Sequence, residues 1–202
     1  MQKQELITEF DQAPTLEWSQ ALSENPPFAR VRVRGHYDTT WHLLLDNKIL
    51  DGRTGVHVLS LFRPDQGQAV LVNRGWLPLP PDRSTLPEVP TPSGSLWISG
   101  ILGTPVQGGI RLGEPQPLHV LEGSILTTYL DLDLVNQALD GILLPRLLQL
   151  SASDPTGFDG RNWQPAVILP SQHGAYAVQW FALALAMCII WLALGFARGN
   201  RA

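Results

Sequence analysis

Phe-Ala-Arg-Val-Arg-Val-Arg, at residues 28–34, is the stretch of sequence that decides the fold. Charged and apolar residues alternate along it with a period of two, which is the pattern of a β-strand that buries one face. The alternation places Arg30, Arg32 and Arg34 on the same face of the strand. That face is either simply solvated or a site for an anion or a protein partner, and the pattern alone leaves both interpretations open.

Strand-like segments separated by turn residues fill most of the chain around this stretch. They lie at residues 36–50, 56–62, 68–76, 96–102, 118–121, 125–129 and 142–150. A turn at Asp46-Asn47 would fold the first of these segments into a hairpin, and Pro145 interrupts the last one. Many short strands with turns at modest spacing favour a sheet closed into a barrel or packed as a sandwich.

Helical periodicity is confined to a few short segments before residue 170. Residues 2–10 and 131–139 have apolar residues at helical spacing. Residues 78–92 contain six prolines and should form an irregular excursion without strand pairing. We therefore predict a mainly β (α+β) fold, a small antiparallel β-barrel or sandwich-like domain with short helices.

The C-terminal part of the chain has a different character. Residues 175–197 form an apolar run without a charge, followed at once by Arg198 and Arg201. As a helix the run would extend about 34 Å, enough to cross a hydrocarbon core of about 30 Å. We predict a transmembrane α-helix at residues 171–198 and a cytoplasmic tail at residues 199–202, because positive charge favours the cytoplasmic side.

This orientation places residues 1–170 outside the cytoplasm as a mainly β domain. The chain opens with Met-Gln-Lys-Gln-Glu-Leu-Ile-Thr-Glu-Phe, which has no apolar signal of its own. Two explanations stay open at this point. Either an N-terminal membrane segment is missing from the sequence, or the protein is tail-anchored with its domain in the cytoplasm.

Composition and motifs exclude several classes of function. The residues before His173 hold eighteen acidic and twelve basic side chains, a net charge of −6 that argues against nucleic acid as a partner. The single cysteine, Cys188, can form no intrachain disulfide. The sequence has no nucleophile elbow, no phosphate-binding glycine loop and no His-Glu-x-x-His. His36 and His42 on one strand would be about 20 Å apart, too far to share a metal.

Asn73-Arg74-Gly75-Trp76 is the first of two candidate functional stretches. An arginine on the inner face of a strand needs partners, because an unpaired buried charge is costly. We expect Arg74 to form a structural ion pair with an acid on one of the preceding strands. Gly75 would let another backbone or a ligand approach closely. We interpret the stretch as a structural element or a partner-binding face.

His173, Tyr176 and Trp180 form the second candidate stretch. If the C-terminal helix begins just before His173, the three side chains lie on one stripe at the membrane surface. An imidazole in this position could ligate the iron of an amphiphilic haem whose tail enters the lipid. The alternative is an interfacial polar residue with no further role.

Both stretches resemble the Surfeit locus protein 1 family. The resemblance rests on Val-Leu-Val-Asn-Arg-Gly-Trp-Leu-Pro at residues 70–78 and on Leu-Asp-Asn-Lys-Ile-Leu-Asp-Gly-Arg-Thr-Gly-Val-His-Val-Leu at residues 45–59. His173, Tyr176-Ala177 and Gln179-Trp180-Phe181 are similar to the start of the second membrane helix of the family. The family places a first membrane helix ahead of the segment that begins here at Met1, so the resemblance implies that this helix is missing from the sequence and favours export of the domain.

The resemblance implies an assembly factor for haem-copper cytochrome c oxidase, not an enzyme, that assists the delivery of haem a to subunit I or its retention there. In this interpretation His173 ligates the haem iron, and Tyr176 and Trp180 contact the haem. The implied partners are subunit I, the machinery of haem a synthesis and membrane lipid. The implied location is the bacterial inner membrane, with the domain facing the periplasm. The alternative function is a membrane-tethered periplasmic adaptor domain that binds a protein partner without a cofactor.

Overall fold

The computed structural model describes residues 8–80, 85–104, 120–121, 124–163 and 179–191. The chain divides into two compact units, Met1–Pro165 and Ala166–Ala202, and each is described by itself.

The first unit is mainly β, as predicted, and its described residues also include two short helices, α2 and α3, and a helical turn at residues 8–11. Its elements in chain order are β1 (Thr15–Glu17), α2 (Trp18–Glu24), β2 (Phe28–Leu50), β3 (Arg53–Pro64), β4 (Ala69–Pro78), β5 (Leu96–Gly103), β6 (Val120–Leu121), β7 (Ser124–Thr127), α3 (Leu132–Ala138) and β8 (Leu143–Leu150).

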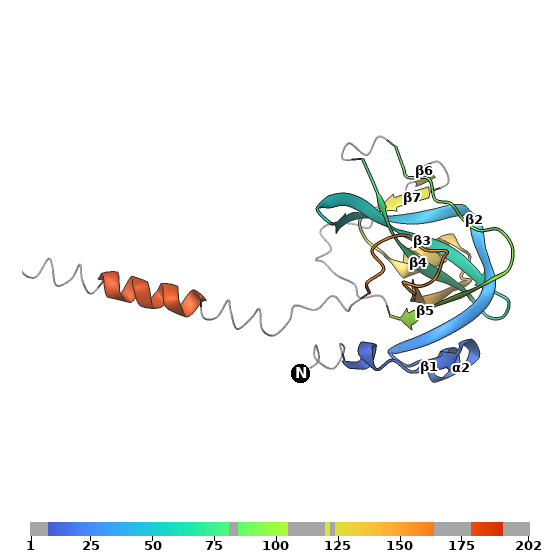
Figure 1. Ribbon diagram of the computed structural model, residues 1–202, viewed down its shortest axis with the longest axis horizontal. Helices are drawn as coiled ribbons and strands as arrows, with labels where there is room; N and C mark the ends of the chain where they lie inside the picture. Colours follow the sequence, from blue (N-terminus) through green and yellow to red (C-terminus); the bar gives the residue numbers. More distant parts are fainter. Residues whose placement is uncertain (1–7, 81–84, 105–119, 122–123, 164–178, 192–202) are drawn as a thin grey trace, which may run out of the picture. The chain divides into compact units, whose positions relative to one another are not determined.

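Five of these strands close into a barrel (Figure 1). Around the barrel the order is β2-β3-β4-β8-β5, and β5 pairs again with β2. The neighbours run antiparallel except for β4 and β8, which are parallel. This order and these directions are those of the five-stranded Greek-key barrel of the OB type. The barrel was one of the two predicted architectures, whereas the parallel pair was not predicted, because no local pattern reports which distant strands will meet.

Strand β2 closes the barrel because it pairs with two different strands. Its first part, Phe28–Gly35, pairs with β5, and its remainder pairs with β3. Gly35 lies where the partner changes, opposite both Leu96 and Pro64. A Cβ atom at Gly35 would lie 2.2 Å from the carbonyl oxygen of Arg63, so a side chain there would force the strands apart. The glycine therefore permits the close approach that closes the barrel.

The hairpin between β2 and β3 turns at a different place from the one predicted. The turn is Asp51-Gly52, with φ of 49° and 74°, the positive values that a two-residue hairpin turn requires. Asp46-Asn47, which we expected to form the turn, is instead an irregularity within β2 between the pairs Leu45↔His57 and Lys48↔Gly55. There the Asp46 carboxylate accepts a hydrogen bond from the backbone N–H of Asn47 at 2.6 Å.

The alternation at residues 28–34 has the predicted effect on burial. Ala29, Val31 and Val33 are buried in the main core, and the three arginines between them are exposed. Helix α2 closes one end of the barrel by packing Trp18 and Ala21 on that core. Helix α2 was not predicted from the sequence, because its single buried stripe is too short for periodicity to reveal.

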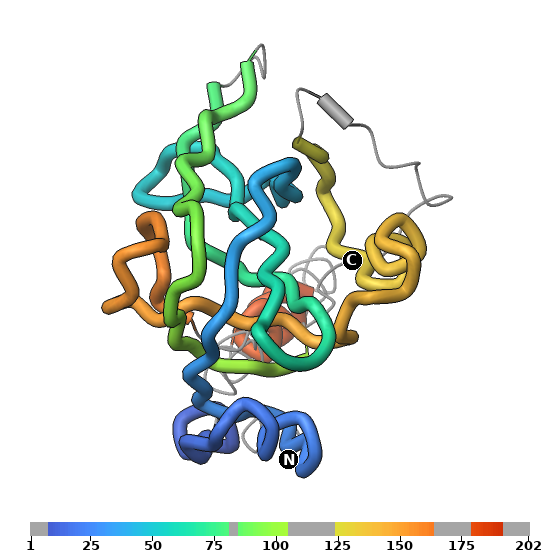
Figure 2. Tube along the Cα trace, turned by 90° about the vertical axis from the view of Figure 1, so that its right-hand side faces the viewer, coloured from blue at the N-terminus to red at the C-terminus, as the bar shows by residue number. Residues whose placement is uncertain are grey.

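Helix α3 covers the side of the barrel, and it agrees with the helix predicted at residues 131–139. Its Leu132 and Val135 pack on leucines of β2, β3, β4 and β8, and Figure 2 shows α3 beside the barrel and the N-terminal segment at its end. The carboxylate of Asp131 caps the helix by accepting hydrogen bonds from Asp133 N and Leu134 N. Pro145 lies in β8 where the register with β4 is irregular, between Leu143 and Leu147, so the strand continues past it.

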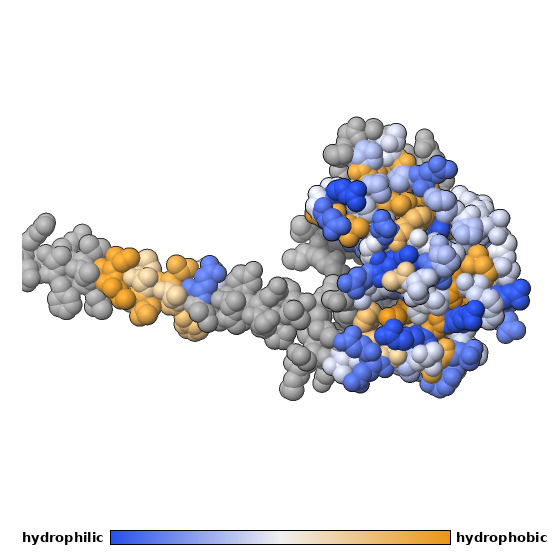
Figure 3. Space-filling model, in the orientation of Figure 1, coloured by the Kyte–Doolittle hydropathy of each residue, from blue (hydrophilic) through white to orange (hydrophobic). Residues whose placement is uncertain are grey.

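In the second unit the structure describes residues 179–191, which are helical. Their side chains are exposed, and all except Gln179 are apolar or small (Figure 3). Among the described residues no helix is both long enough and apolar enough to span a membrane. The transmembrane helix predicted for residues 171–198 extends beyond the described residues at both ends and stays a prediction.

Candidate functional site

The three residues predicted to contact haem fall mostly outside the described part of the chain. His173 and Tyr176 lie outside the described residues. Trp180 lies in the described helix, where its side chain is 70% exposed. Among the described residues of the second unit, its indole ring is therefore largely accessible.

Residues 73–76, the other predicted stretch, lie on β4 and are buried. Arg74 is 2% exposed and Trp76 is 2% exposed. Every residue of β4 from Ala69 to Trp76 is buried, because the barrel core lies on one side of the strand and covering segments lie on the other. The contacts of these side chains are therefore internal to the domain.

Within the part of the chain that the structure describes, Arg74 does not form the ion pair that we expected. Its Nε and Nη2 atoms donate hydrogen bonds to the carbonyl oxygen of Thr156 at 2.9 and 2.7 Å. Nη2 also donates to the carbonyl oxygen of Pro90 at 2.8 Å, and Nη1 donates to the hydroxyl of Thr91 at 3.2 Å. Neutral acceptors from two loops thus take the place of the expected carboxylate, and the guanidinium ties both loops to β4.

Two aromatic rings complete the surroundings of the Arg74 side chain. The guanidinium carbon lies 4.8 Å from the centre of the Tyr37 ring and 4.6 Å from that of the Phe158 ring. Such contacts stabilise a cation through the negative face of the ring. Burial lowers the pKa of Arg74, and the nearby Tyr37 and Asp154 oppose this effect. The side chain stays charged because an arginine pKa starts above 12.

Polar groups around Arg74 form one connected cluster, which sequence reasoning missed. His42 contacts the hydroxyls of Ser60 at 3.0 Å through Nδ1 and of Thr91 at 3.1 Å through Nε2. Burial, followed by the charge of Arg74, lowers the pKa of His42 to about 4. The imidazole is therefore neutral at physiological pH.

The same cluster extends through Tyr37 to the loop after β8. The Tyr37 hydroxyl lies 3.2 Å from the hydroxyl of Thr156, and burial raises the pKa of Tyr37 to about 12. The Asp154 carboxylate accepts hydrogen bonds from the backbone N–H of Thr156 at 3.0 Å and from that of Ser99 at 3.1 Å. These hydrogen bonds hold the loop that follows β8 against the barrel.

Gly75 makes the close backbone contact that its position suggested. Its φ is +113°, and a Cβ atom would lie 2.6 Å from the carbonyl oxygen of Asp159. On either side of it the backbones pair: Trp76 N donates to Asp159 O at 2.8 Å, and Phe158 N donates to Arg74 O at 2.6 Å. The partner that approaches Gly75 is thus the chain itself, at residues 158–159.

The remaining members of the stretch also have internal partners. The Asn73 side-chain oxygen accepts a hydrogen bond from Gly75 N at 3.2 Å. The Trp76 indole N–H donates to the carbonyl oxygen of Lys48 at 3.0 Å, and Arg53 covers its ring at 5.4 Å. The stretch therefore joins β4 to β2 and to the loop after β8.

A second buried arginine, Arg146, donates hydrogen bonds to backbone carbonyl groups as Arg74 does. Arg146 on β8 is 5% exposed, and its Nη2 atom donates to the carbonyl oxygens of Pro26 at 2.6 Å and Leu102 at 3.2 Å. Burial lowers its pKa as well. Nothing in the sequence around residue 146 distinguishes this arginine from an exposed one. Only the position of β8 beside β5 places it against these carbonyls.

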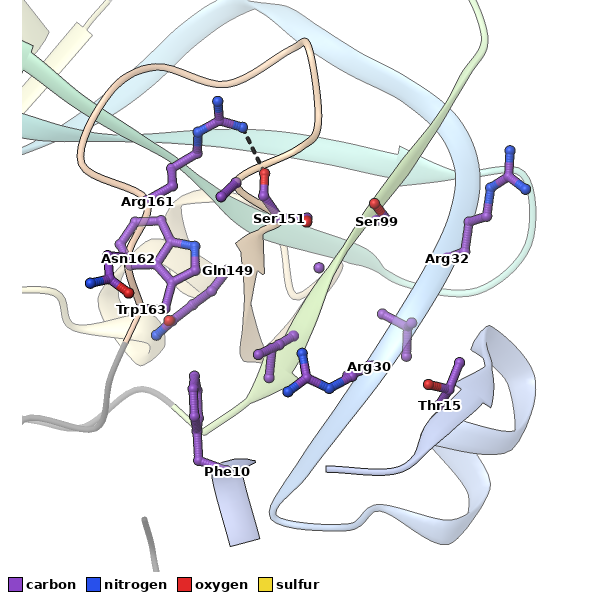
Figure 4. A pocket seen from close by; sticks show the side chains of 14 residues that line it. Phe10, Thr15, Arg30, Arg32, Ser99, Gln149, Ser151, Arg161, Asn162 and Trp163 are labelled. Carbon is purple, nitrogen blue, oxygen red and sulfur yellow. Dashed lines mark hydrogen bonds between the residues drawn. The ribbon is translucent and has the colours of Figure 1, made fainter. Parts of the chain in front are cut away.

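A pocket of about 480 Å³ lies on the outer face of the barrel (Figure 4). Its floor is formed by residues of β2, β5 and β8, and Phe10 and residues 161–163 line it as well. Arg30, from the alternating stretch, lines it together with Trp163. Among the described residues, no group of His, Cys, Asp and Glu side chains is arranged to hold a metal ion.

The strand order and the buried side chains define an OB-type barrel domain. Its buried arginines, Arg74 and Arg146, hold the loops of the domain in place. In the sequence this domain is followed by an apolar run. The family model of the SURF1 family, the Surfeit locus protein 1 family, matches residues 1–185. The chain belongs to this family, which is a family of cytochrome oxidase assembly factors and not a known enzyme family.

A curated relative is similar along the whole chain. A SURF1-like protein of Monosiga brevicollis is 26% identical over 223 aligned residues, which cover 99% of this chain and 80% of the relative.

Proposed function

We propose that this protein assists the delivery of haem a to subunit I of a haem-copper cytochrome c oxidase, or its retention there. The observation that carries the proposal is the family match over residues 1–185, which spans the barrel and continues through His173, Tyr176 and Trp180. A match confined to the barrel would support only the fold.

In this proposal His173 ligates the iron of haem a as a cargo, and Tyr176 and Trp180 contact the porphyrin. The exposed indole of Trp180 supports this role, because it is available for contact with a ligand. The apolar side chains of residues 179–191 are also exposed, and a helix that is apolar on all sides needs an apolar environment. A bacterial inner membrane, with the barrel in the periplasm, would supply that environment.

The barrel would then be the part that recognises protein partners. Its loops are held rigidly by Arg74 and Arg146, so it could present a fixed surface to subunit I or to the machinery of haem a synthesis. A preorganised surface loses less entropy on binding than a mobile one. Membrane lipid is the remaining proposed contact.

Complementation tests the proposal. The gene is deleted, and oxidase activity and the haem a content of subunit I are measured after return of the full chain or of a variant. We expect the deletion to lower both, the full chain to restore both, and His173→Ala to restore neither. His36→Ala is the matched control, because it removes an exposed imidazole from the barrel.

A normal level of haem a in subunit I of the deletion strain would contradict the proposal. Full restoration by His173→Ala would contradict the ligand role and favour an adaptor that binds a protein partner without a cofactor. The amount of each variant in the membrane fraction is measured in parallel, so that loss of the protein is not mistaken for loss of function.

A further inference from the structure

The pocket on the outer face of the barrel has a charge opposite to that of the domain around it. Among its described lining residues there are three arginines, Arg30, Arg32 and Arg161, and no acidic residue. The chain before His173 nevertheless carries eighteen acids against twelve basic residues. The pocket is therefore locally positive, whereas the domain as a whole is negative.

Arg30 is the arginine available to a ligand. It is exposed, and within the described residues its guanidinium has no hydrogen bond or ion pair. Figure 4 shows it directed toward the space between Phe10 and β5, whereas Arg32 points away. Arg32 instead contacts the Trp97 ring at 4.8 Å.

Arg161 serves mainly to shape the pocket. Its guanidinium donates hydrogen bonds to the carbonyl oxygens of Phe158, Ser151 and Asp154, each at 2.6 Å. These bonds fix the segment that forms one wall. They also leave its positive charge beside the pocket without a carboxylate partner in the described chain.

The walls of the pocket are apolar and held in place. Phe10 packs edge-on against Phe28, with ring centres 5.2 Å apart, and Ile101 and Trp163 pack on the same cluster. The Trp163 indole N–H donates to the carbonyl oxygen of Leu150 at 2.6 Å, which fixes the ring. One part of the pocket is therefore suited to an apolar group and another to an anion.

Gln149 adds a polar group that lacks a partner. It lines the pocket, and its side-chain oxygen is buried with no hydrogen bond in the described chain. A buried amide oxygen without a partner carries a free-energy cost.

We propose that this pocket binds an anionic amphiphile, a molecule with one phosphate or carboxylate group joined to an apolar body. Arg30 would pair with the anionic group, and Phe10, Ile101 and Trp163 would contact the apolar body. The volume of about 480 Å³ lies within the usual range for small-molecule sites, roughly 300–1,000 Å³. The proposal does not depend on haem a or on the oxidase.

Calorimetric titration of the full chain tests the proposal. The protein is placed in nanodiscs of neutral phosphatidylcholine, and the signal of empty nanodiscs is subtracted. Octyl phosphate and nonanoate are the two anionic probes, which separate a phosphate from a carboxylate preference. Octyl glucoside tests the apolar body without the charge, and inorganic phosphate tests the charge without the apolar body.

We expect saturable binding of one molecule of at least one anionic probe, and weaker or no binding of octyl glucoside and inorganic phosphate. Arg30→Gln should weaken binding of that probe by about tenfold, since a charge-assisted hydrogen bond is lost. Arg30→Lys should recover part of the affinity. Arg34→Gln is the matched control on the same strand face, because Arg34 lies outside the pocket and pairs with Asp65 at 3.7 Å.

Three results would overturn the proposal. They are the absence of saturable binding of both anionic probes, equal affinity for octyl glucoside, and an equal loss of affinity in the Arg30→Gln and Arg34→Gln variants. Both arginines are exposed, so neither substitution should affect folding, and thermal unfolding of each variant verifies this.

Discussion

Gly75→Ala should destabilise the barrel strongly, because Gly75 combines an unusual backbone conformation with a close backbone contact. At φ of +113° an alanine is strained, at a cost of about 1–3 kcal/mol. Its Cβ would also lie 2.6 Å from Asp159 O, so residues 158–159 would have to move away from β4.

That movement would break the backbone hydrogen bonds between Trp76 and Asp159 and between Phe158 and Arg74, each worth about 1 kcal/mol. Together with the strain, the expected loss is about 3–5 kcal/mol. Since a domain of this kind is stable by about 5–15 kcal/mol, the substitution should remove a large part of its stability.

Gly52→Ala separates the two causes. Gly52 also has a positive φ, +74°, but a Cβ atom there would meet no atom within 4 Å. Its substitution should cost only about 1 kcal/mol. Both variants are measured by urea unfolding of the full chain in neutral nanodiscs, followed by tryptophan fluorescence. Equal losses of unfolding free energy would refute the reasoning, because they would show that contact with residues 158–159 contributes nothing.

Two further predictions concern the buried polar cluster. Arg74→Met should lower the unfolding free energy by about 3 kcal/mol, because the carbonyls of Pro90 and Thr156 lose their donor, whereas Arg34→Met should change it by less than about 0.5 kcal/mol. Similar losses in the two variants would contradict the structural role of Arg74. Burial lowers the folded-state pKa of His42 and of His57 from 6.5 to about 4, so between these values the unfolded chain binds more protons than the folded chain. Stability should therefore fall as the pH falls through this window, and His42→Gln should make the fall shallower in urea unfolding measured from pH 7 to pH 4. An unchanged slope would contradict a buried neutral His42.

The strands of the barrel could be predicted because their burial pattern is local. The alternation at residues 28–34 depends only on which face meets the core, and the structure has the expected exposed arginines and buried valines. The same holds for α3, whose cap and apolar stripe lie within nine residues of one another.

The topology could not be predicted from such patterns. The parallel pairing of β4 with β8 joins segments that are far apart in sequence, and neither strand contains a mark that specifies the other. The hairpin turn was misplaced for a different reason. Asp46-Asn47 and Asp51-Gly52 are both acceptable turn sequences, and the structure uses the pair with glycine, which tolerates positive φ best.

The interior of the candidate site was predicted only in part. The need of Arg74 for partners follows from burial, and the close approach at Gly75 follows from its missing side chain. The identity of the partners does not follow, because Pro90 and Thr156 are brought to Arg74 by loops with no recognisable pattern. Arg30 was recognised only as one of three equivalent arginines. Its difference from Arg32 and Arg34 arises from the pocket beside it.

The central claim, that the chain carries haem a through His173, is tested most directly by the absorption spectrum of the purified full chain. The protein is expressed in cells that make haem a and isolated in neutral nanodiscs, and bound haem is determined per polypeptide. We predict a haem a spectrum for the full chain and for His36→Ala, and its loss for His173→Ala with the protein still folded and in the membrane. A full chain free of haem a, or a His173→Ala variant with undiminished haem a, would contradict the claim.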